Sequence, residues 1–353
     1  MGRIRPFLRD DIPDIVALRR KAFRHSEHPG AADLGAYLDE IFFHNPWRDD
    51  ALPSLVYLDG AGRIVGFLGR VPRRAMFQGQ AVRVAVGTQL MVDPAQRELA
   101  AVELVRAFLA GSQDLSFADV ANEVSRQIWD ALGGGISLLQ TFQWTQPLRP
   151  SRFYANKFAQ RLPVRGLAWA LAPVCWAIDG VIARWPQVAG LRTVPLTAAA
   201  MAAHLSDLLG GVPLRPDYDE RSAAWLLEQL AAKRTLGELR RTALEDSEGG
   251  LVGWYLYYAS RRGIGQVVQV AARKHRYGDV LQSLFHDAWR EGLTALAGRL
   301  EPALLPTVAD RGAFLTRDGP GVLVHSTRPE LVAAIRRGEA FLSRLEGEWW
   351  MSF

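Results

Sequence analysis

The order of apolar and polar positions in the first 145 residues predicts a module of mixed strands and helices. Apolar runs bounded by turn residues are typical of strands, and apolar residues spaced three and four apart are typical of amphipathic helices. Asp10-Asp11-Ile12-Pro13 predicts a helix start, because it places carboxylates and a proline in the first turn. The predicted elements are a strand at 4–8, helices at 10–23 and 33–43, strands at 54–58, 63–70 and 81–92, a helix at 97–109, a strand at 117–121, a helix at 123–132 and a strand at 140–145.

A similar order of elements recurs in the second half of the chain. The segment from Asp59 to Phe67 resembles the segment from Asp246 to Trp254, since both hold a turn, two β-forming residues, a glycine and an aromatic residue. We therefore predict two tandem α/β modules with mixed sheets, and chance similarity between two unrelated α/β domains is the alternative. The predicted boundaries are a first module at 1–150, an apolar and basic linker at 151–191, and a second module at 192–353.

Composition narrows the class of protein. The 353 residues are 49% hydrophobic and 22% charged, which is typical of a folded protein and excludes wholesale disorder. The single cysteine excludes an internal disulfide, and the spacing of the seven histidines predicts no metal site. The net charge of +5 comes without an arginine-rich arm, so we expect no nucleic-acid partner. The N-terminus opens into patterned sequence, which predicts no signal peptide and a cytoplasmic location.

The junction after the long predicted strand carries a recognisable pattern. It reads Val92-Asp-Pro94-Ala-Gln-Arg97-Glu-Leu-Ala-Ala-Val102. With the element order, it resembles the GCN5-related N-acetyltransferase superfamily, and the doubled order resembles its tandem members. In that family Val-x-Pro-x-x-Arg-Gly-x-Gly-x-Gly/Ala binds the pyrophosphate of coenzyme A through backbone amides, because a helix N-terminus favours phosphate. Alanine and valine stand here at two glycine positions, and a junction without ligand is the alternative. The resemblance implies that acetyl-CoA or a longer acyl-CoA is bound by Met91, Val92, Arg97, Glu98, Leu99, Ala100, Ala101 and Val102.

A second stretch, from Asn122 to Gly133, resembles the family pattern Asn-x-x-Ala-x-x-Leu-Tyr-x-x-x-Gly. The resemblance implies that Asn122 caps a helix and that Asn122 and Ser125 face the pantetheine arm of the cofactor. Trp129 stands where the family often has a tyrosine that protonates the leaving thiolate. An indole cannot give up its proton at any accessible pH, so this function is lost here or Trp129 is simply a core residue.

Acyl transfer to an amine requires a base or an ordered water molecule that removes a proton. Glu123 is our first candidate for the base, because it directly follows the strand that opens beside the cofactor; the alternative is that it only complements a helix dipole. Asp93 is the other nearby acid, and Gln89 could orient water. In the second module, Arg273, Lys274 and Arg276 form a cluster that we interpret as a solvated loop, so that copy is predicted to be structural or substrate-shaping.

The predicted linker is the least ordinary stretch. Eighteen residues between Arg165 and Arg184 carry one charge, Asp179, and include Trp169 and Trp176. Residues 151–196 hold six basic residues against one acid. Three interpretations stay open: a buried helix between the modules, a segment in the interface of an anionic membrane, and a short membrane-spanning helix.

Together these features predict an acyl-CoA-dependent N-acyltransferase. Its acceptor would be an amine on an envelope sugar, a polysaccharide precursor or a lipid, and membrane contact would be peripheral. A non-catalytic ligand-binding or scaffold protein with a degenerate acetyltransferase fold is the main alternative. Aminoacyl transfer from charged tRNA is less favoured, because no basic face is predicted.

Overall fold

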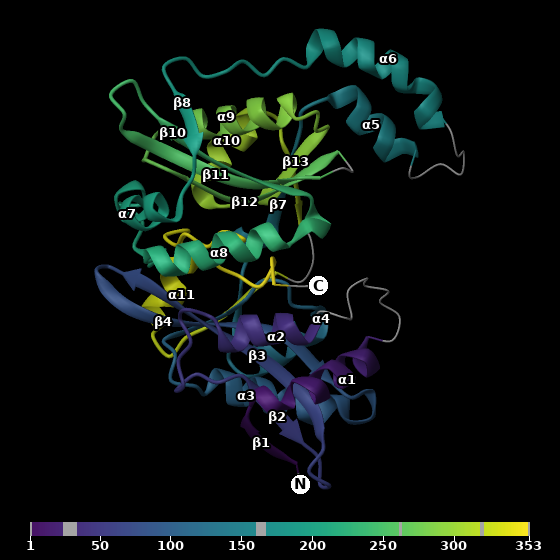
Figure 1. Ribbon diagram of the computed structural model, residues 1–353, viewed down its shortest axis with the longest axis vertical. Coiled ribbons are helices and arrows are strands. Elements are labelled where there is room, and N and C mark those ends of the chain that lie inside the picture. The colour runs from purple at the N-terminus through teal and green to yellow at the C-terminus, as the bar shows by residue number, and fades with distance from the viewer. Residues whose placement is uncertain (1, 24–33, 160–166, 261–262, 318–320, 352–353) are drawn as a thin grey trace. The chain divides into compact units, whose positions relative to one another are not determined.

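The computed structural model describes residues 2–23, 34–159, 167–260, 263–317 and 321–351 (Figure 1). The chain forms two compact units, and neither is continuous in sequence. The first unit comprises residues 1–138, 212–225 and 319–353. The second unit comprises residues 139–211 and 226–318. Each unit is built around one mixed β-sheet.

The first unit contains an eight-stranded sheet in the order β1-β2-β3-β4-β5-β15-β6, with β9 paired to β3. β4 and β5 are parallel, and the other neighbours are antiparallel. The strands are β1 (Arg3–Pro6), β2 (Leu55–Leu58), β3 (Ile64–Phe77), β4 (Gln80–Val92), β5 (Leu115–Ala118), β6 (Gly135–Ser137), β9 (Leu214–Pro216) and β15 (Val322–His325). Its helices are α1 (Ile12–Ala22), α2 (Leu34–Phe43), α3 (Arg97–Leu109), α4 (Glu123–Ala131) and α11 (Pro329–Arg336).

Helices α2 and α3 cover opposite faces of this sheet. Gly66 and Gly69 lie three residues apart on β3, so they face opposite sides. A Cβ at Gly66 would lie 3.0 Å from Leu104 of α3, whereas a Cβ at Gly69 would lie 2.7 Å from Phe42 of α2. The core beneath α3 is built from Leu104 and the apolar side chains around it, which include buried Phe108. The two faces of the sheet are therefore closed by close helix packing.

The second unit contains a seven-stranded sheet in the order β14-β7-β13-β12-β11-β10-β8, in which β12 and β13 are parallel. Its core gathers Trp144, Tyr255 and Phe285 from the sheet and a covering helix. The strands are β7 (Phe142–Pro147), β8 (Arg192–Pro195), β10 (Glu238–Glu245), β11 (Leu251–Ala259), β12 (Ile264–Ala272), β13 (Ala295–Arg299) and β14 (Phe314–Arg317). The helices are α5 (Pro150–Ala159), α6 (Leu167–Ile182), α7 (Ala198–Leu208), α9 (Tyr277–Arg290) and α10 (Leu305–Asp310); α8 (Glu220–Ala232) begins in the first unit and ends in the second.

The mixed α/β class with two sheets is confirmed, but the units differ from the continuous modules that the sequence predicts. The predicted last strand of the first module forms β7, which belongs to the second sheet. The first sheet instead takes β15, which pairs with both β5 and β6. The residues of the predicted linker form α5 and α6 within the second unit. Periodicity predicts where a strand forms but not which sheet edge it joins, because pairing depends on tertiary partners.

Candidate active site

The parallel strands β4 and β5 separate at the centre of the first unit. They pair over only three residues, from Val84 to Val86 on β4, and β4 then continues to Val92 while β5 ends at Ala118. The register of β4 against β3 shifts beyond Thr88, and Gln89 has a left-handed backbone with φ 54°. This bulge bends β4, and the two strands part beyond it.

A pocket of about 410 Å³ lies where the strands part. Its walls come from residues 87–90 of β4, from Ala118 at the end of β5, from residues 120–122, and from helices α1, α3 and α4. Leu68 of β3 and Glu348 also line it. Such concave and mostly apolar sites with a few polar groups are where small molecules usually bind. The polar side chains among its described lining are those of Arg19, Thr88, Gln89, Asn122, Ser125, Trp129 and Glu348.

The junction predicted to bind phosphate forms the entry to α3. A 3-10 turn at Pro94–Gln96 leads into the helix, and Gln96 makes no side-chain capping hydrogen bond. The first amides of a helix lack intrahelical partners, so this terminus presents N–H groups with partial positive charge. Ala100 and Ala101 are buried. Leu99 is 63% exposed, and Val102 is half-buried.

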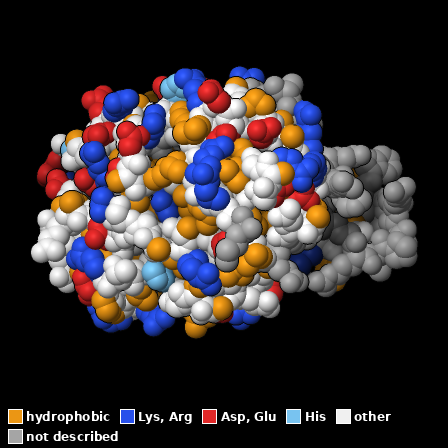
Figure 2. All heavy atoms as spheres, turned by 90° about the horizontal axis from the view of Figure 1, so that it is seen from below, with side chains coloured by type: hydrophobic (Ala, Val, Ile, Leu, Met, Phe, Trp, Pro, Cys, Tyr) orange, Lys and Arg blue, Asp and Glu red, His pale blue; other side chains and the backbone are white. Residues whose placement is uncertain are grey.

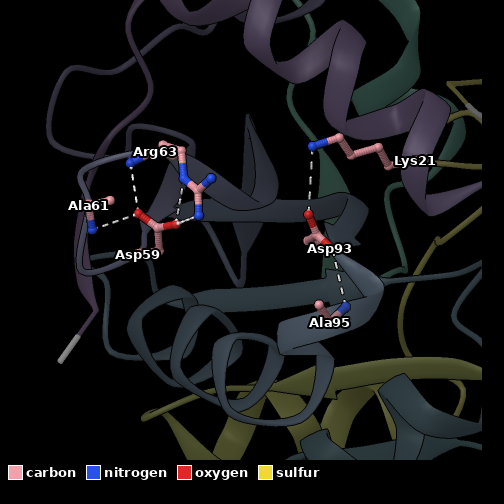
Figure 3. A network of polar contacts seen from close by, with 6 residues as sticks. All are labelled: Lys21, Asp59, Ala61, Arg63, Asp93 and Ala95. Atoms are coloured by element: carbon pink, nitrogen blue, oxygen red, sulfur yellow. Dashed lines mark hydrogen bonds and ion pairs between the residues drawn. The ribbon is translucent and has the colours of Figure 1, made fainter.

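Asp93 orders this junction. Its Oδ1 accepts a hydrogen bond of 3.1 Å from the backbone N–H of Ala95, and its Oδ2 lies 3.9 Å from the Lys21 ammonium of α1 (Figure 3). In the neighbouring turn between β2 and β3, Asp59 accepts hydrogen bonds from the backbone N–H groups of Ala61 and Arg63, each 2.9 Å long. Both aspartates therefore stabilise turns, and neither is among the described pocket-lining residues.

The remaining predicted cofactor residues fall into two groups. Met91 and Val92 are buried in the core, with 1% and 5% of their surface exposed, so only their backbone can meet a ligand. The side chains of Arg97 and Glu98 lie outside the described residues. Asn122 caps α4, as predicted, by accepting a hydrogen bond of 2.8 Å from the backbone N–H of Ser125. Of the predicted cofactor residues, Asn122 and Ser125 are among the described lining of the pocket.

Comparison with known proteins finds similarity at the level of structure. No family model and no curated protein matches the sequence. A GCN5-related N-acetyltransferase from Anabaena variabilis aligns over 93% of this chain and 74% of its own, with a TM-score of 0.60 and 14% identity. A probable N-acyltransferase from Enterococcus faecalis aligns over 92% and 73%, with a TM-score of 0.59 and 14% identity. Saccharomyces cerevisiae N-myristoyltransferase with bound myristoyl-CoA aligns over 91% and 77%, with a TM-score of 0.52 and 11% identity.

The chain has the GCN5-related N-acetyltransferase fold. Within this acetyltransferase fold, Trp129 is 4% exposed and packs against Phe108 of α3, with ring centroids 6.0 Å apart. It also lines the pocket. The core-packing interpretation of Trp129 therefore fits its position, and its indole leaves the pocket without a tyrosine hydroxyl at that place.

The two predicted catalytic side chains lie in different surroundings. The Glu123 side chain is 57% exposed on α4, where it forms an ion pair with Arg126, and it is not among the described lining of the pocket. Gln89 does line the pocket. Its carboxamide Nε2 and Oε1 atoms are buried and have no hydrogen-bond partner among the described residues. Buried polar atoms normally have partners, so the Gln89 carboxamide is suited to a polar ligand atom.

Glu348 is the pocket residue that the sequence analysis missed. The residue is only 9% exposed, and its Oε1 accepts a hydrogen bond of 3.2 Å from the backbone N–H of Val120. Burial raises the pKa of Glu348 to about 8, and the negative charge of Asp119 adds to this effect, whereas hydrogen bonds to the carboxylate oppose it. The available signal was an acid directly before Trp349 and Trp350, in a segment rich in apolar residues.

The corresponding stretch of the second unit is an exposed turn between β12 and α9. Arg273 and Lys274 are exposed, and His275 has a left-handed backbone with φ 70°. The Arg276 guanidinium donates a hydrogen bond of 2.6 Å to Asp279 in the first turn of α9. The cluster thus has the form of the solvated loop that we predicted. Among the described residues of the whole chain, no group of three His, Cys, Asp or Glu side chains is placed to hold a metal ion.

Proposed function

We propose that the protein is an acyl-CoA-dependent N-acyltransferase whose reaction takes place in the pocket of the first unit. The observation that carries this proposal is the position of the pocket, which opens where β4 and β5 part and is bordered by α3 and the capped start of α4. The structural neighbours support an acyltransferase fold, and one of them binds myristoyl-CoA. A degenerate, non-catalytic binding protein is the competing reading.

The residues present fit an acyl-CoA. The uncapped amides at the start of α3 suit a pyrophosphate, and the small buried side chains of Ala100 and Ala101 let backbone and ligand approach. Lys21, 60% exposed beside Asp93, supplies a cation at the same junction. We assign the pantetheine arm to Asn122 and Ser125, which line the pocket. The thioester would then lie beside Gln89.

The chemistry requires a neutral amine to attack the thioester carbonyl. The Gln89 carboxamide has no hydrogen-bond partner among the described residues, and it can orient the amine or a water molecule because it has both a donor and an acceptor. Glu123 remains a candidate base from the sequence alone, but its ion pair with Arg126 on the exposed side of α4 does not favour that role. We therefore favour Gln89 over Glu123 as the residue that assists the attacking amine.

Calorimetry with acetyl-CoA and a long-chain acyl-CoA tests the co-substrate. Leu99→Glu places a negative charge at the exposed start of α3, so we expect at least tenfold weaker binding of either thioester without loss of folding. Leu138→Glu is the matched control, because Leu138 is 61% exposed and lies outside the described pocket lining. If neither thioester binds at millimolar concentration, the degenerate binding protein replaces the enzyme proposal.

The acceptor is proposed to be a lipidic or envelope-derived amine, reached by peripheral contact with an anionic membrane on its cytoplasmic side. The support comes from α6, in which Val181 is 72% exposed and Trp176 is 64% exposed. Asp179, the only charged residue of this helix, is 4% exposed. It accepts hydrogen bonds from the backbone N–H of Ser151 and from the Arg152 guanidinium of α5. The surface exposed by the described side chains of α6, residues 173–182, is therefore apolar.

Basic side chains accompany this apolar surface. Arg152 lies over the Trp176 ring, 4.8 Å from its centroid, and Lys157 belongs to the same helix, α5. A tryptophan and cations beside an apolar helix are suited to the headgroup region of an anionic bilayer. The exposure of Val181 and Trp176 does not fit the buried-linker interpretation, and no helix in the described part of the chain has the length and apolarity needed to cross a membrane.

Flotation with liposomes of graded anionic lipid content tests this contact. We expect co-flotation that rises with anionic lipid, falls with salt, and is lost in the variant carrying Trp176→Glu and Val181→Glu. Leu138→Glu is again the control. Protein that stays at the bottom of the gradient at every lipid composition would contradict membrane contact. By contrast, Figure 2 shows basic and acidic side chains interspersed on the visible face, which offers no single-sign surface for nucleic acid.

A further inference from the structure

The structure assigns a catalytic role to Glu348 within the proposed acyl transfer, on which this inference rests. We propose that the Glu348 carboxyl group protonates the departing thiolate and afterwards takes up the proton that the amine nitrogen loses. Three observations support it: how the terminal segment is held, which groups face the carboxyl, and which other ionisable groups line the pocket.

Residues 340–351, which we call the terminal segment, are held at several points of the first unit, so Glu348 has a defined position. The backbone N–H of Glu348 donates a hydrogen bond of 2.6 Å to Asp119 Oδ1, in the segment after β5. The Tyr37 hydroxyl of α2 donates to the carbonyl oxygen of Met351. The Trp350 indole N–H donates a hydrogen bond of 3.0 Å to the backbone carbonyl of Leu345. The buried Arg73 guanidinium lies over the same ring, 5.5 Å from its centroid. These contacts fix the chain on both sides of Glu348.

Burial and the charge of Asp119 favour the protonated form of Glu348, and they outweigh hydrogen bonds from the backbone N–H groups of Val120 and Gln89, which favour the carboxylate. Burial is the main cause of its raised pKa, and Asp119 adds a negative charge. Burial raises the pKa of the Tyr37 hydroxyl of α2, and the negative charge of Glu348 raises it further. The Tyr37 phenol is therefore neutral. Arg19 of α1 is the cation of the same pocket, and burial lowers its pKa. With a pKa of about 8, the Glu348 carboxyl holds its proton at neutral pH yet can release it.

No other described residue lining the pocket can carry a proton in this way. The ionisable side chains among that lining are those of Arg19 and Glu348. A guanidinium does not release its proton at accessible pH, and neither does the indole of Trp129. A proton donor works best when its pKa lies near the operating pH. Glu348 is thus the group in the pocket whose proton can reach a thiolate.

The step balances with the proposed substrates alone. The neutral amine attacks the thioester carbon, which forms the C–N bond and leaves a positive charge on nitrogen and a negative charge on oxygen. Collapse of this intermediate breaks the C–S bond, and the thiolate sulfur takes the proton of the Glu348 carboxyl. The carboxylate so formed accepts the proton from the protonated amide nitrogen. The products are the amide and free coenzyme A, and Glu348 returns to its starting state.

Glu348→Gln is the decisive variant, because a neutral carboxamide has nearly the shape of the protonated carboxyl but cannot release a proton. We expect kcat to fall by 10²-fold or more while calorimetry shows unchanged acyl-CoA binding. The wild-type rate should decline above about pH 8, where the carboxyl ionises, and this decline should vanish in the variant. Glu330→Gln is the control, since Glu330 is an exposed carboxylate of the first unit paired with Arg328.

A comparison of leaving groups distinguishes proton donation from a structural role and does not depend on the variant folding. A thiolate whose thiol is a stronger acid than coenzyme A is a better leaving group, so its departure depends less on protonation by Glu348. With an S-aryl thioester, the wild-type decline above pH 8 should weaken, and Glu348→Gln should lose less activity than with acetyl-CoA. A pH decline and a variant defect that are the same for both donors would overturn the assignment. Failure of any acyl-CoA to bind would instead refute the proposed function itself.

Discussion

Gly347 lies directly against the carboxylate of Asp119: a Cβ built on Gly347 would be 2.0 Å from Asp119 Oδ2. No side chain larger than hydrogen fits there without movement. Because the next residue, Glu348, donates its backbone N–H to the same carboxylate, this close approach sets the distance between the terminal segment and the end of β5.

Gly347→Ala should therefore displace the terminal segment. We expect it to lower the free energy of unfolding by about 1–3 kcal/mol, as overpacking of a tight site does, and to reduce acyl transfer along with it. Urea denaturation and an activity assay measure the two effects. Gly60→Ala is the control, because a Cβ there meets nothing within 4 Å. Equal stability of the two variants would show that the terminal segment moves freely.

The buried carboxyl of Glu348 should also give stability a pH dependence. In the unfolded chain a glutamate ionises near pH 4.3, at about its ordinary pKa, whereas in the folded protein Glu348 keeps its proton up to about pH 8. Between these values the folded state binds more protons than the unfolded state. The contribution of Glu348 to the free energy of unfolding is therefore complete below about pH 4.3 and is lost as the pH rises through about 8. The loss amounts to up to about 1.4 kcal/mol per pH unit.

Urea denaturation at several pH values, on wild type and Glu348→Gln, measures this contribution. The difference in unfolding free energy between the two proteins should shift in favour of the variant as the pH rises from 5 toward about 8. A difference that is constant over this range would mean that Glu348 ionises in the folded protein as it does in the unfolded chain.

Gln89→Met separates binding from folding. Methionine keeps the unbranched shape but removes two buried polar atoms that have no partner among the described residues. We expect the free energy of unfolding to stay the same or rise, because removing an unsatisfied polar group relieves a desolvation cost. If Gln89 orients the amine, kcat/KM should fall about tenfold, the effect of one lost hydrogen bond. An unchanged kcat/KM would remove Gln89 from the reaction.

Glu123→Gln tests the base that sequence reasoning preferred. A true base would lose 10²-fold or more in turnover. Since the Glu123 side chain is 57% exposed and paired with Arg126, we expect nearly unchanged turnover and a stability loss of no more than about 1 kcal/mol. Steady-state kinetics and thermal unfolding measure the two. A large loss of turnover with intact acyl-CoA binding would return Glu123 to the catalytic list.

The sequence predicted most of the first unit because its long elements have clear periodicity. The helices at 97–109 and 123–131 and the Asn122 cap follow from local patterns that do not depend on distant residues. The strand β15 has only four residues, which is too short for a pattern of apolar and polar positions to indicate which strands it pairs with. Glu348 was missed for a related reason: residues 340–351 are largely buried without regular secondary structure, so no repeat of apolar positions marks which side chain faces the pocket.

The interleaved order of the chain has a consequence for its synthesis. The first sheet is incomplete until β15 has been made, and the pocket lacks one wall until Glu348 has been added. A nascent chain that stalls on the ribosome anywhere before residue 322 therefore exposes an unfinished sheet edge and holds no complete pocket, however well its first 138 residues have collapsed. Termination anywhere before residue 348 should thus abolish the site, even when the first 138 residues are complete.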